Sequence, residues 1–206
     1  MAQCFHIHPQ NPEPRLIKQA AGVLLSGGVI IYPTDSTYAL ACHIGDKSAL
    51  ERIRRIRQLD DRHNFTLMCA DLSSISTYAK VSNSAYRLVK AYTPGPYTFI
   101  LSATAEVPRR LMHPKRKTIG LRIPDNRVAQ ALLQEVGEPV MSTSLILPGD
   151  ENPLSEVYEI QERMGNLVDL IIGSNACGLT ATTVVDLVDG EPKLLREGKG
   201  DPGPFR

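Results

Sequence analysis

Apolar and polar residues recur along the chain with two different periods, which predicts helices and strands in turn. In the first third, apolar residues at helical spacing predict a helix over 15–26, and Gly27-Gly28 supplies a stop signal for it. An unbroken apolar run predicts a buried strand over 29–32. A second helix is expected over 47–59, because its apolar residues again fall on one helical face.

The rest of the chain continues this alternation, and most elements end at a glycine, a proline or a capping residue. The pair Asp189-Gly190 predicts a two-residue hairpin between the last two strands. Strands mixed with helices and a hairpin indicate an α/β (α+β) fold around a mixed sheet. The further strands are expected around Met68 and over 97–102, 118–123, 140–144, 168–172, 182–188 and 193–196, and the further helices over 82–91, 126–135 and, capped by Ser155, 155–164.

Composition and charge narrow the class of protein. The 206 residues include 23 Lys and Arg against 22 Asp and Glu, so the formal net charge of +1 excludes a polycation. The hydrophobic content is ordinary and the charges are mixed in sign, which argues against a disordered chain. The length predicts one domain, or at most two small ones.

Targeting and metal signals are absent from the sequence. The N-terminus, MAQCFHIHPQ, has no basic segment followed by an apolar one, and no apolar run reaches the ~20 residues that a membrane span needs. The four cysteines form no C-x-x-C pair, and the histidines lack metal-ligand spacing. We therefore expect a cytoplasmic protein with reduced thiols, no metal site built from its side chains and no membrane partner.

Hydroxyl side chains gather where predicted strands begin or end. Thr34 and Thr37 follow the first strand, Ser142 and Ser144 close a later one, and Thr182 opens another. Strand ends loaded with hydroxyls are common ligand sites in α/β proteins, because several donors converge there. Such segments also form ordinary turns that hydrogen-bond to their own backbone, so both interpretations stay open at this point.

Arginines cluster in two stretches. In the first, Arg54 and Arg57 share one helical face, while Arg52, Arg55 and Arg62 share another. Guanidinium groups can bind polyphosphate or an RNA backbone through a bidentate fork. The alternative is a solvated helix with Asp60 and Asp61 as local partners.

The second stretch includes Arg110 and Lys115 and ends in Arg122, which lies inside an apolar strand. An arginine there is costly unless it is paired, so Arg122 is expected to face a cleft or to form a structural salt bridge. The preceding basic loop is either solvated or a contact for nucleic-acid phosphates. Loops 104–117 and 145–154 are long enough to border such a cleft.

Six short motifs in one order carry a family resemblance. They are Gly27-Gly28 with 32–40, then 94–98, 121–124, 142–144, 182–186 and 195–198. Together they resemble the YrdC/YciO family over residues 10–200, in a single domain. The resemblance implies a twisted mixed sheet flanked by helices, with a large concave, positively charged cleft.

The resemblance also implies an activity. ATP, L-threonine and bicarbonate would give threonylcarbamoyl-adenylate (threonylcarbamoyl-AMP) and pyrophosphate, a step in tRNA threonylcarbamoyladenosine modification, with Mg²⁺ held by the ATP phosphates. No side chain is singled out as catalytic. The residues that it places at nucleotide and substrate are Thr34, Thr37, Arg57, Arg122, Ser142, Ser144, Thr182 and Arg196.

Three departures from the family pattern put this activity in question. The family commonly has Lys-x-Arg where this chain has Arg57 and Leu59, and Asn where it has Ile146. Each lost charge-assisted contact costs roughly 1.5–3 kcal/mol, so weak synthase activity is expected. The alternative is a non-catalytic paralogue that binds tRNA or double-stranded RNA through the basic cleft. Its candidate contacts are Arg54, Arg55, Arg62, Arg110 and Lys115, and the oligomeric state is left open.

Overall fold

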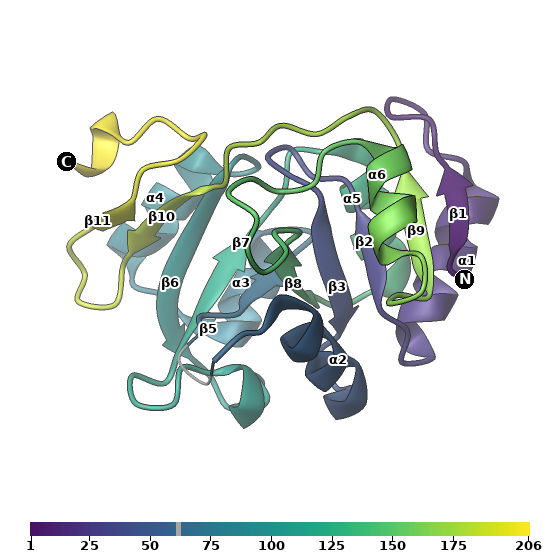
Figure 1. The fold of residues 1–206 in the computed structure, drawn as a ribbon. Coiled ribbons are helices and arrows are strands. Elements are labelled where there is room, and N and C mark those ends of the chain that lie inside the picture. The colour runs from purple at the N-terminus through teal and green to yellow at the C-terminus, as the bar shows by residue number, and fades with distance from the viewer. Residues whose placement is uncertain (61–62) are drawn as a thin grey trace.

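The computed structural model describes residues 1–60 and 63–206, and it confirms the predicted mixed α/β fold (Figure 1). The strands are β1 Gln3–His6, β2 Ile30–Tyr32, β3 Ala39–His43, β4 Thr66–Met68, β5 Ala79–Lys80, β6 Tyr97–Ala103, β7 Thr118–Arg122, β8 Val140–Ser144, β9 Leu170–Gly173, β10 Thr183–Asp186 and β11 Lys193–Arg196. The helices are α1 Pro14–Leu25, α2 Lys47–Arg57, α3 Leu72–Tyr78, α4 Asn83–Tyr92, α5 Arg127–Val136 and α6 Val157–Met164, with short 3₁₀ turns η1 Arg109–Leu111 and η2 Gly203–Phe205.

One mixed sheet runs through the molecule in the order β1-β9-β2-β3-β8-β4-β7-β6-β10-β11, with β5 paired to β6. Antiparallel pairs such as β3 with β8 alternate with parallel pairs such as β4 with β7 and β6 with β10. The predicted hairpin is present, since β10 and β11 are antiparallel on either side of the Asp189-Gly190 turn. The long segment between β9 and β10 runs over the top of the sheet and connects its two sides (Figure 1).

Two hydrophobic clusters hold the helices to this sheet. Helices α1 and α5 pack with buried residues of β2, β3 and β9, such as Leu24, Ile30 and Leu132. The other cluster joins buried residues of α2, α3, α4 and α6 to the central strands, for example Ile53, Val89 and Phe99. Each cluster buries apolar side chains of both partners, which is the main favourable term for such a layered fold.

Strand alternation then leaves part of one sheet face free of these clusters. On β8, Val140 packs in the cluster of α1 and α5, whereas Ser142 and Ser144 point to the same side further along the strand. The register continues this side across the sheet, because Ser142 lies opposite Thr66 on β4, and Thr66 lies opposite Gly120 on β7. The resulting strip of small and polar residues is the floor of the site described below.

Helices α2 to α5 each begin at a residue whose side chain caps the first turn, but the cap predicted at Ser155 is not formed. The Asp46 side chain accepts from the Ala49 amide at 2.8 Å, and the Asn126 side chain accepts from the Ala129 amide at 3.0 Å. Gly137 ends α5 with a positive φ of 79°, which glycine adopts without strain. Ser155 is not the cap of α6: the extended residue before the helix is Glu156, one position later, and its side chain forms no capping hydrogen bond.

Among the helices and strands, β3, β5 and α3 were not predicted from the sequence. Strand β3 is buried throughout its first four residues, and its small side chains give no clear alternation. Helix α3 is short and rich in serine and threonine, and it depends on Asp71, whose carboxylate accepts from the Ser74 amide. The N-terminal β1 forms a parallel edge strand beside β9.

Candidate functional site

A cavity of about 340 Å³ lies on the polar strip of the sheet. Seven strands contribute to it, from β3 through β8, β4, β7, β6 and β10 to β11, together with the end of α2 and the segment before β4. Its described lining residues are Thr37, Ala39, Arg57, His63, Asn64, Thr66, Met68, Thr98, Ile100, Arg122, Ser142, Thr143, Ser144, Ile146, Ala181, Thr182, Val184, Leu195 and Arg196.

The structure brings most of the predicted site residues together at this cavity. Of the eight residues that the family motifs point to, seven line it, although they are spread over 160 positions from residue 37 to residue 196. These seven are Thr37, Arg57, Arg122, Ser142, Ser144, Thr182 and Arg196. Thr34 is the exception, because it is buried behind the cavity wall.

Thr34 organises the turn that follows β2. Its hydroxyl donates to the Thr37 carbonyl at 2.6 Å and accepts from the Ser36 amide at 3.1 Å and the Thr37 amide at 3.2 Å. It also accepts from the Arg122 guanidinium at 3.3 Å. Thr34 therefore has the role of an ordinary turn residue, and that turn presents Thr37 to the cavity.

Arg122 combines the two roles that the sequence left open. Its guanidinium forms a buried ion pair with Asp35, and the same side chain lines the cavity. The pair is incomplete in hydrogen bonds, since Arg122 Nε and Asp35 Oδ2 are buried without a partner among the described residues. Asp35 thus fixes Arg122 in place at the wall of the cavity.

The hydroxyls of the floor are held by partners underneath. Ser142 donates to the Leu40 carbonyl at 3.2 Å, so the Tyr32 hydroxyl, 2.8 Å away, donates to Ser142. Burial raises the pKa of Tyr32 to about 12, which keeps this phenol protonated. On the far side of the cavity, the hydroxyls of Thr98 and Thr182 are 2.8 Å apart.

Two further arginines anchor the ends of the cavity to main-chain oxygens. Arg196 donates through Nε and Nη2 to the Thr182 carbonyl at 3.1 and 2.9 Å. Arg57 donates to the Ile146 carbonyl. Burial lowers the pKa of both guanidinium groups, and for Arg196 the charge of Arg122 adds to the effect. Among the described lining residues there is no carboxylate, so this cavity attracts anions.

His63 and Asn64 also line the cavity, although neither was singled out as a site residue from the sequence. The ring of His63 packs edge-on against Phe65, with centroids 5.3 Å apart. Burial, together with the charges of Arg57 and Arg54, lowers the pKa of His63 to about 4, while Asp60 opposes the shift. His63 is therefore neutral at physiological pH. The sequence signal that could have identified His63 is its position just before β4, whose Thr66 lies on the polar strip.

Gly120 keeps the floor of the cavity open. A Cβ atom at this position would lie 2.9 Å from Thr66 Oγ1 and 3.2 Å from Thr98 Cγ2. Both distances are shorter than normal contacts between such atoms. The absence of a side chain therefore lets Thr66 and Thr98 approach each other across β7.

Of the proposed RNA contacts, the four that the structure describes do not line this cavity. Arg54 pairs with Glu51 at 3.7 Å and lies over the Phe65 ring, and Arg110 donates to the Ile44 carbonyl at 3.0 Å. Arg55 and Lys115 are exposed elsewhere, and Arg62 lies outside the described residues. Expecting loop 104–117 to border the cleft was wrong, because η1 packs next to the turn before α2; the segment after β8 does border it, through Ile146.

The departures from the family pattern differ in their surroundings. Ile146 lines the cavity, and its carbonyl is the acceptor for Arg57. Leu59 instead packs against the hydrophobic cluster of α2, and it is not among the described lining residues. The position of the family arginine, Leu59, thus packs against the core. The position of the family asparagine, Ile146, adds an apolar surface to the cavity.

Neither a metal centre nor a membrane span is found in the part of the chain that the structure describes. No three His, Cys, Asp or Glu side chains come together there in a way that could hold a metal ion. No helix in 1–60 or 63–206 is long and apolar enough to cross a bilayer.

Fold and site together define an open mixed sheet whose uncovered part holds a cavity lined by arginines and hydroxyl side chains. The sequence model of the Sua5/YciO/YrdC family, described as "Telomere recombination", matches residues 22–198. The chain therefore belongs to this family, which confirms the resemblance that the motifs gave.

Relatives by sequence fall into two groups. The chain is 60% identical to the uncharacterized protein YciO of Escherichia coli K12 over 205 residues, which is 100% of both chains. It is 30% identical to the threonylcarbamoyl-AMP synthase of Vibrio vulnificus YJ016 over 159 residues, 76% of this chain and 84% of the relative.

Solved structures give the same picture. The crystal structure of E. coli YciO superposes with a TM-score of 0.97 over 100% of both chains, at 59% identity. Sua5 of P. abyssi in complex with L-threonine superposes with a TM-score of 0.87 at 25% identity; the match covers 95% of this chain and 57% of Sua5.

Proposed function

We propose that this protein is a threonylcarbamoyl-AMP synthase-like enzyme with weakened activity. It would combine ATP, L-threonine and bicarbonate into threonylcarbamoyl-adenylate and pyrophosphate, for use in tRNA modification. The observation that carries the proposal is the cavity itself, where seven motif residues, three of them arginines, converge and no described lining residue is a carboxylate. Two relatives support it, one named threonylcarbamoyl-AMP synthase and one solved with L-threonine.

The chemistry needs positioning more than it needs a reactive side chain. Threonine's amine and bicarbonate give a carbamate and water, and a carbamate oxygen then attacks the α-phosphorus of ATP. The bond from that phosphorus to the bridging oxygen breaks, and pyrophosphate leaves. Such phosphoryl chemistry is accelerated mainly by alignment and by neutralising charge on the phosphates.

The residues of the cavity fit these tasks. Arg57, Arg122 and Arg196 supply fixed positive charge for phosphate oxygens, each held by an oxygen acceptor of the protein. Thr37, Ser142, Ser144 and Thr182 supply hydroxyl donors and acceptors for the nucleotide and the amino acid. Because the described lining holds no carboxylate, Mg²⁺ would be carried by the ATP phosphates.

Measuring pyrophosphate release tests the proposal. Release should require L-threonine and bicarbonate together, with ATP and Mg²⁺ present, and it should fall at least tenfold in Arg122→Lys because the in-strand guanidinium fork is lost. A matched control is Arg55→Lys, which changes an exposed arginine outside the cavity. Release that stays at background with excess protein, or that ignores threonine, would overturn the proposal.

A second candidate is a non-catalytic RNA-binding paralogue. It is favoured by Leu59, which lies in the core where the family has a charged residue, and by exposed basic groups at Arg55, Arg110 and Lys115. Binding to tRNA or duplex RNA would then weaken steeply with salt and depend on these residues. Retained binding in the triple alanine variant of Arg55, Arg110 and Lys115 would count against it.

A further inference from the structure

His63 lies near Arg57 in the cavity, and it is not among the residues that the family motifs identify. Both line it, and Ser144 and Ile146 line it with them. Arg57 is tethered to the Ile146 carbonyl, and its Nε is buried without a partner among the described residues. This part of the cavity therefore presents a tethered guanidinium close to an imidazole.

The charges that act on His63 come from two segments. Arg54 and Arg57 on α2 disfavour its protonation, and Asp60, just after the helix, favours it. Phe65 contributes an apolar contact on the β4 side. Because burial and two nearby positive charges both disfavour protonation, the imidazole is neutral in the empty site.

We propose that His63 forms an anion site with Arg57 and takes up a proton when a phosphate-like dianion enters it. The inference rests on the proposed function, because it assigns this part of the cavity to a phosphate group of the nucleotide. An entering dianion neutralises the field of Arg57 and accepts a hydrogen bond, both of which favour the imidazolium. His63 then becomes an extra cation for the ligand.

Proton uptake of this kind makes the affinity for the anion higher at low pH than at high pH. The pKa of His63 is about 4 in the empty site and rises when the anion binds. Affinity for the anion therefore increases as pH falls through the pKa of the complex, and it levels off near pH 4. Each unit by which the pKa rises corresponds to about a tenfold gain in affinity for the protonated over the neutral form.

Inorganic sulfate is a suitable probe, because its charge stays at −2 over this pH range. The experiment follows the imidazole Cε1 proton of His63 by NMR between pH 4 and 8 in sodium sulfate and in sodium chloride of equal ionic strength. His63→Asn assigns the resonance, and His113, which lies in the η1–β7 loop outside the cavity, is the internal control. We expect the pKa of His63 to rise by about two units in sulfate, while the His113 resonance is the same in both salts.

Binding measured by calorimetry completes the test. Sulfate affinity should increase about tenfold from pH 7.5 to pH 5 in the native protein and stay flat in His63→Asn. A pKa of His63 that ignores sulfate, or an equal pH dependence in the variant, would overturn the inference. Pyrophosphate release separates it from the proposed function: release without proton linkage refutes only the role of His63, and linkage without release leaves the anion site but refutes the synthase.

Discussion

Arg57 on α2 donates a hydrogen bond to the main-chain oxygen of Ile146, 89 residues away in the segment after β8. This contact joins two of the three positions where the chain departs from the family pattern: an arginine replaces the usual lysine, and an isoleucine replaces the usual asparagine. The guanidinium is thereby held at the cavity by the backbone, without help from a polar side chain at position 146.

Restoring the asparagine should raise activity. In Ile146→Asn, a side-chain amide replaces an apolar group that lines the cavity, and a gain of about 1 kcal/mol from one hydrogen bond corresponds to roughly a fivefold faster pyrophosphate release. Leu59→Arg alone should instead destabilise the fold, because Leu59 packs against the core. A release rate unchanged in Ile146→Asn, measured with threonine and bicarbonate present, would show that this departure does not limit the enzyme.

The ion pair of Arg122 and Asp35 should be essential for stability as well as for binding. Arg122→Met leaves the Asp35 carboxylate buried and unpaired, which should lower the free energy of unfolding by about 3–5 kcal/mol. The double change Asp35→Asn with Arg122→Met removes the buried charge and should recover part of that loss. Urea unfolding of the two variants checks this, and equal stabilities would contradict it.

A side chain at Gly120 should obstruct the cavity. In Gly120→Ala the new methyl group would lie within 3.2 Å of both Thr66 and Thr98, so these floor residues must separate. Nucleotide affinity should fall about tenfold or more, as for a misplaced binding group. The control is Gly22→Ala in α1, where a Cβ meets nothing within 4 Å, and there affinity should be unchanged.

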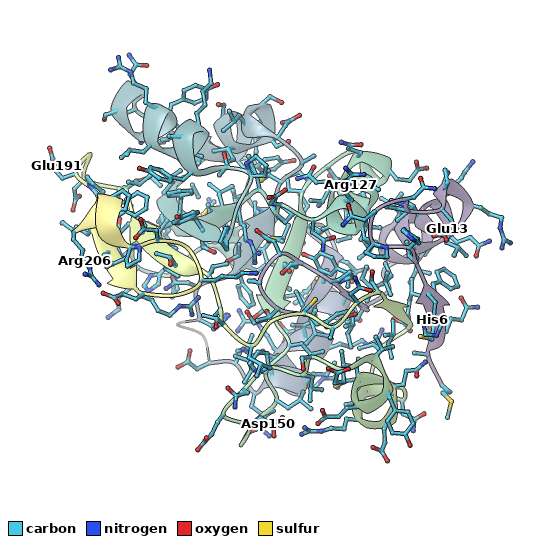
Figure 2. All side chains as sticks on the ribbon, turned by 90° about the horizontal axis from the view of Figure 1, so that it is seen from above. His6, Glu13, Arg127, Asp150, Glu191 and Arg206 are labelled. Atoms are coloured by element: carbon cyan, nitrogen blue, oxygen red, sulfur yellow. The ribbon has the colours of Figure 1, made fainter. Side chains whose placement is uncertain are left out.

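The C-terminal tail should contribute strongly to folding. Phe205 is buried, and its ring lies 4.9 Å from Tyr92 and 5.8 Å from Tyr97, so the tail closes an aromatic cluster beside β6. Figure 2 shows the neighbouring Arg206 at the same end of the molecule as Glu191, away from His6. Phe205→Ala should cost about 3–5 kcal/mol in urea unfolding, whereas Tyr158→Ala, whose ring is exposed, should change stability by less than about 0.5 kcal/mol.

Periodicity and motifs were sufficient for much of the fold and the site. The strand over 140–144 was predicted with its bounds, and its alternation from Val140 to Ser142 and Ser144 is what carries the sheet from core to cavity. The residues that converge from far apart were found because short motifs in a fixed order identified the family.

The sequence could not show which charged side chains line the cavity and which pack elsewhere. Arg54 and Arg57 share a helical face, yet only Arg57 lines the cavity, because Arg54 lies over Phe65. The role of His63 depends on those same neighbours. Thr34 looked like a ligand contact, but the turn it organises buries its hydroxyl behind Arg122.

The most direct measurement is a crystal structure of the protein with a non-hydrolysable ATP analogue, Mg²⁺ and L-threonine. We predict phosphate oxygens within hydrogen-bond distance of Arg57 and of at least one of Arg122 and Arg196, with the amino acid on the hydroxyl floor beside Ser142. A nucleotide bound elsewhere on the surface, or a cavity left without phosphates at saturating analogue, would contradict the assignment of this cavity as the nucleotide site.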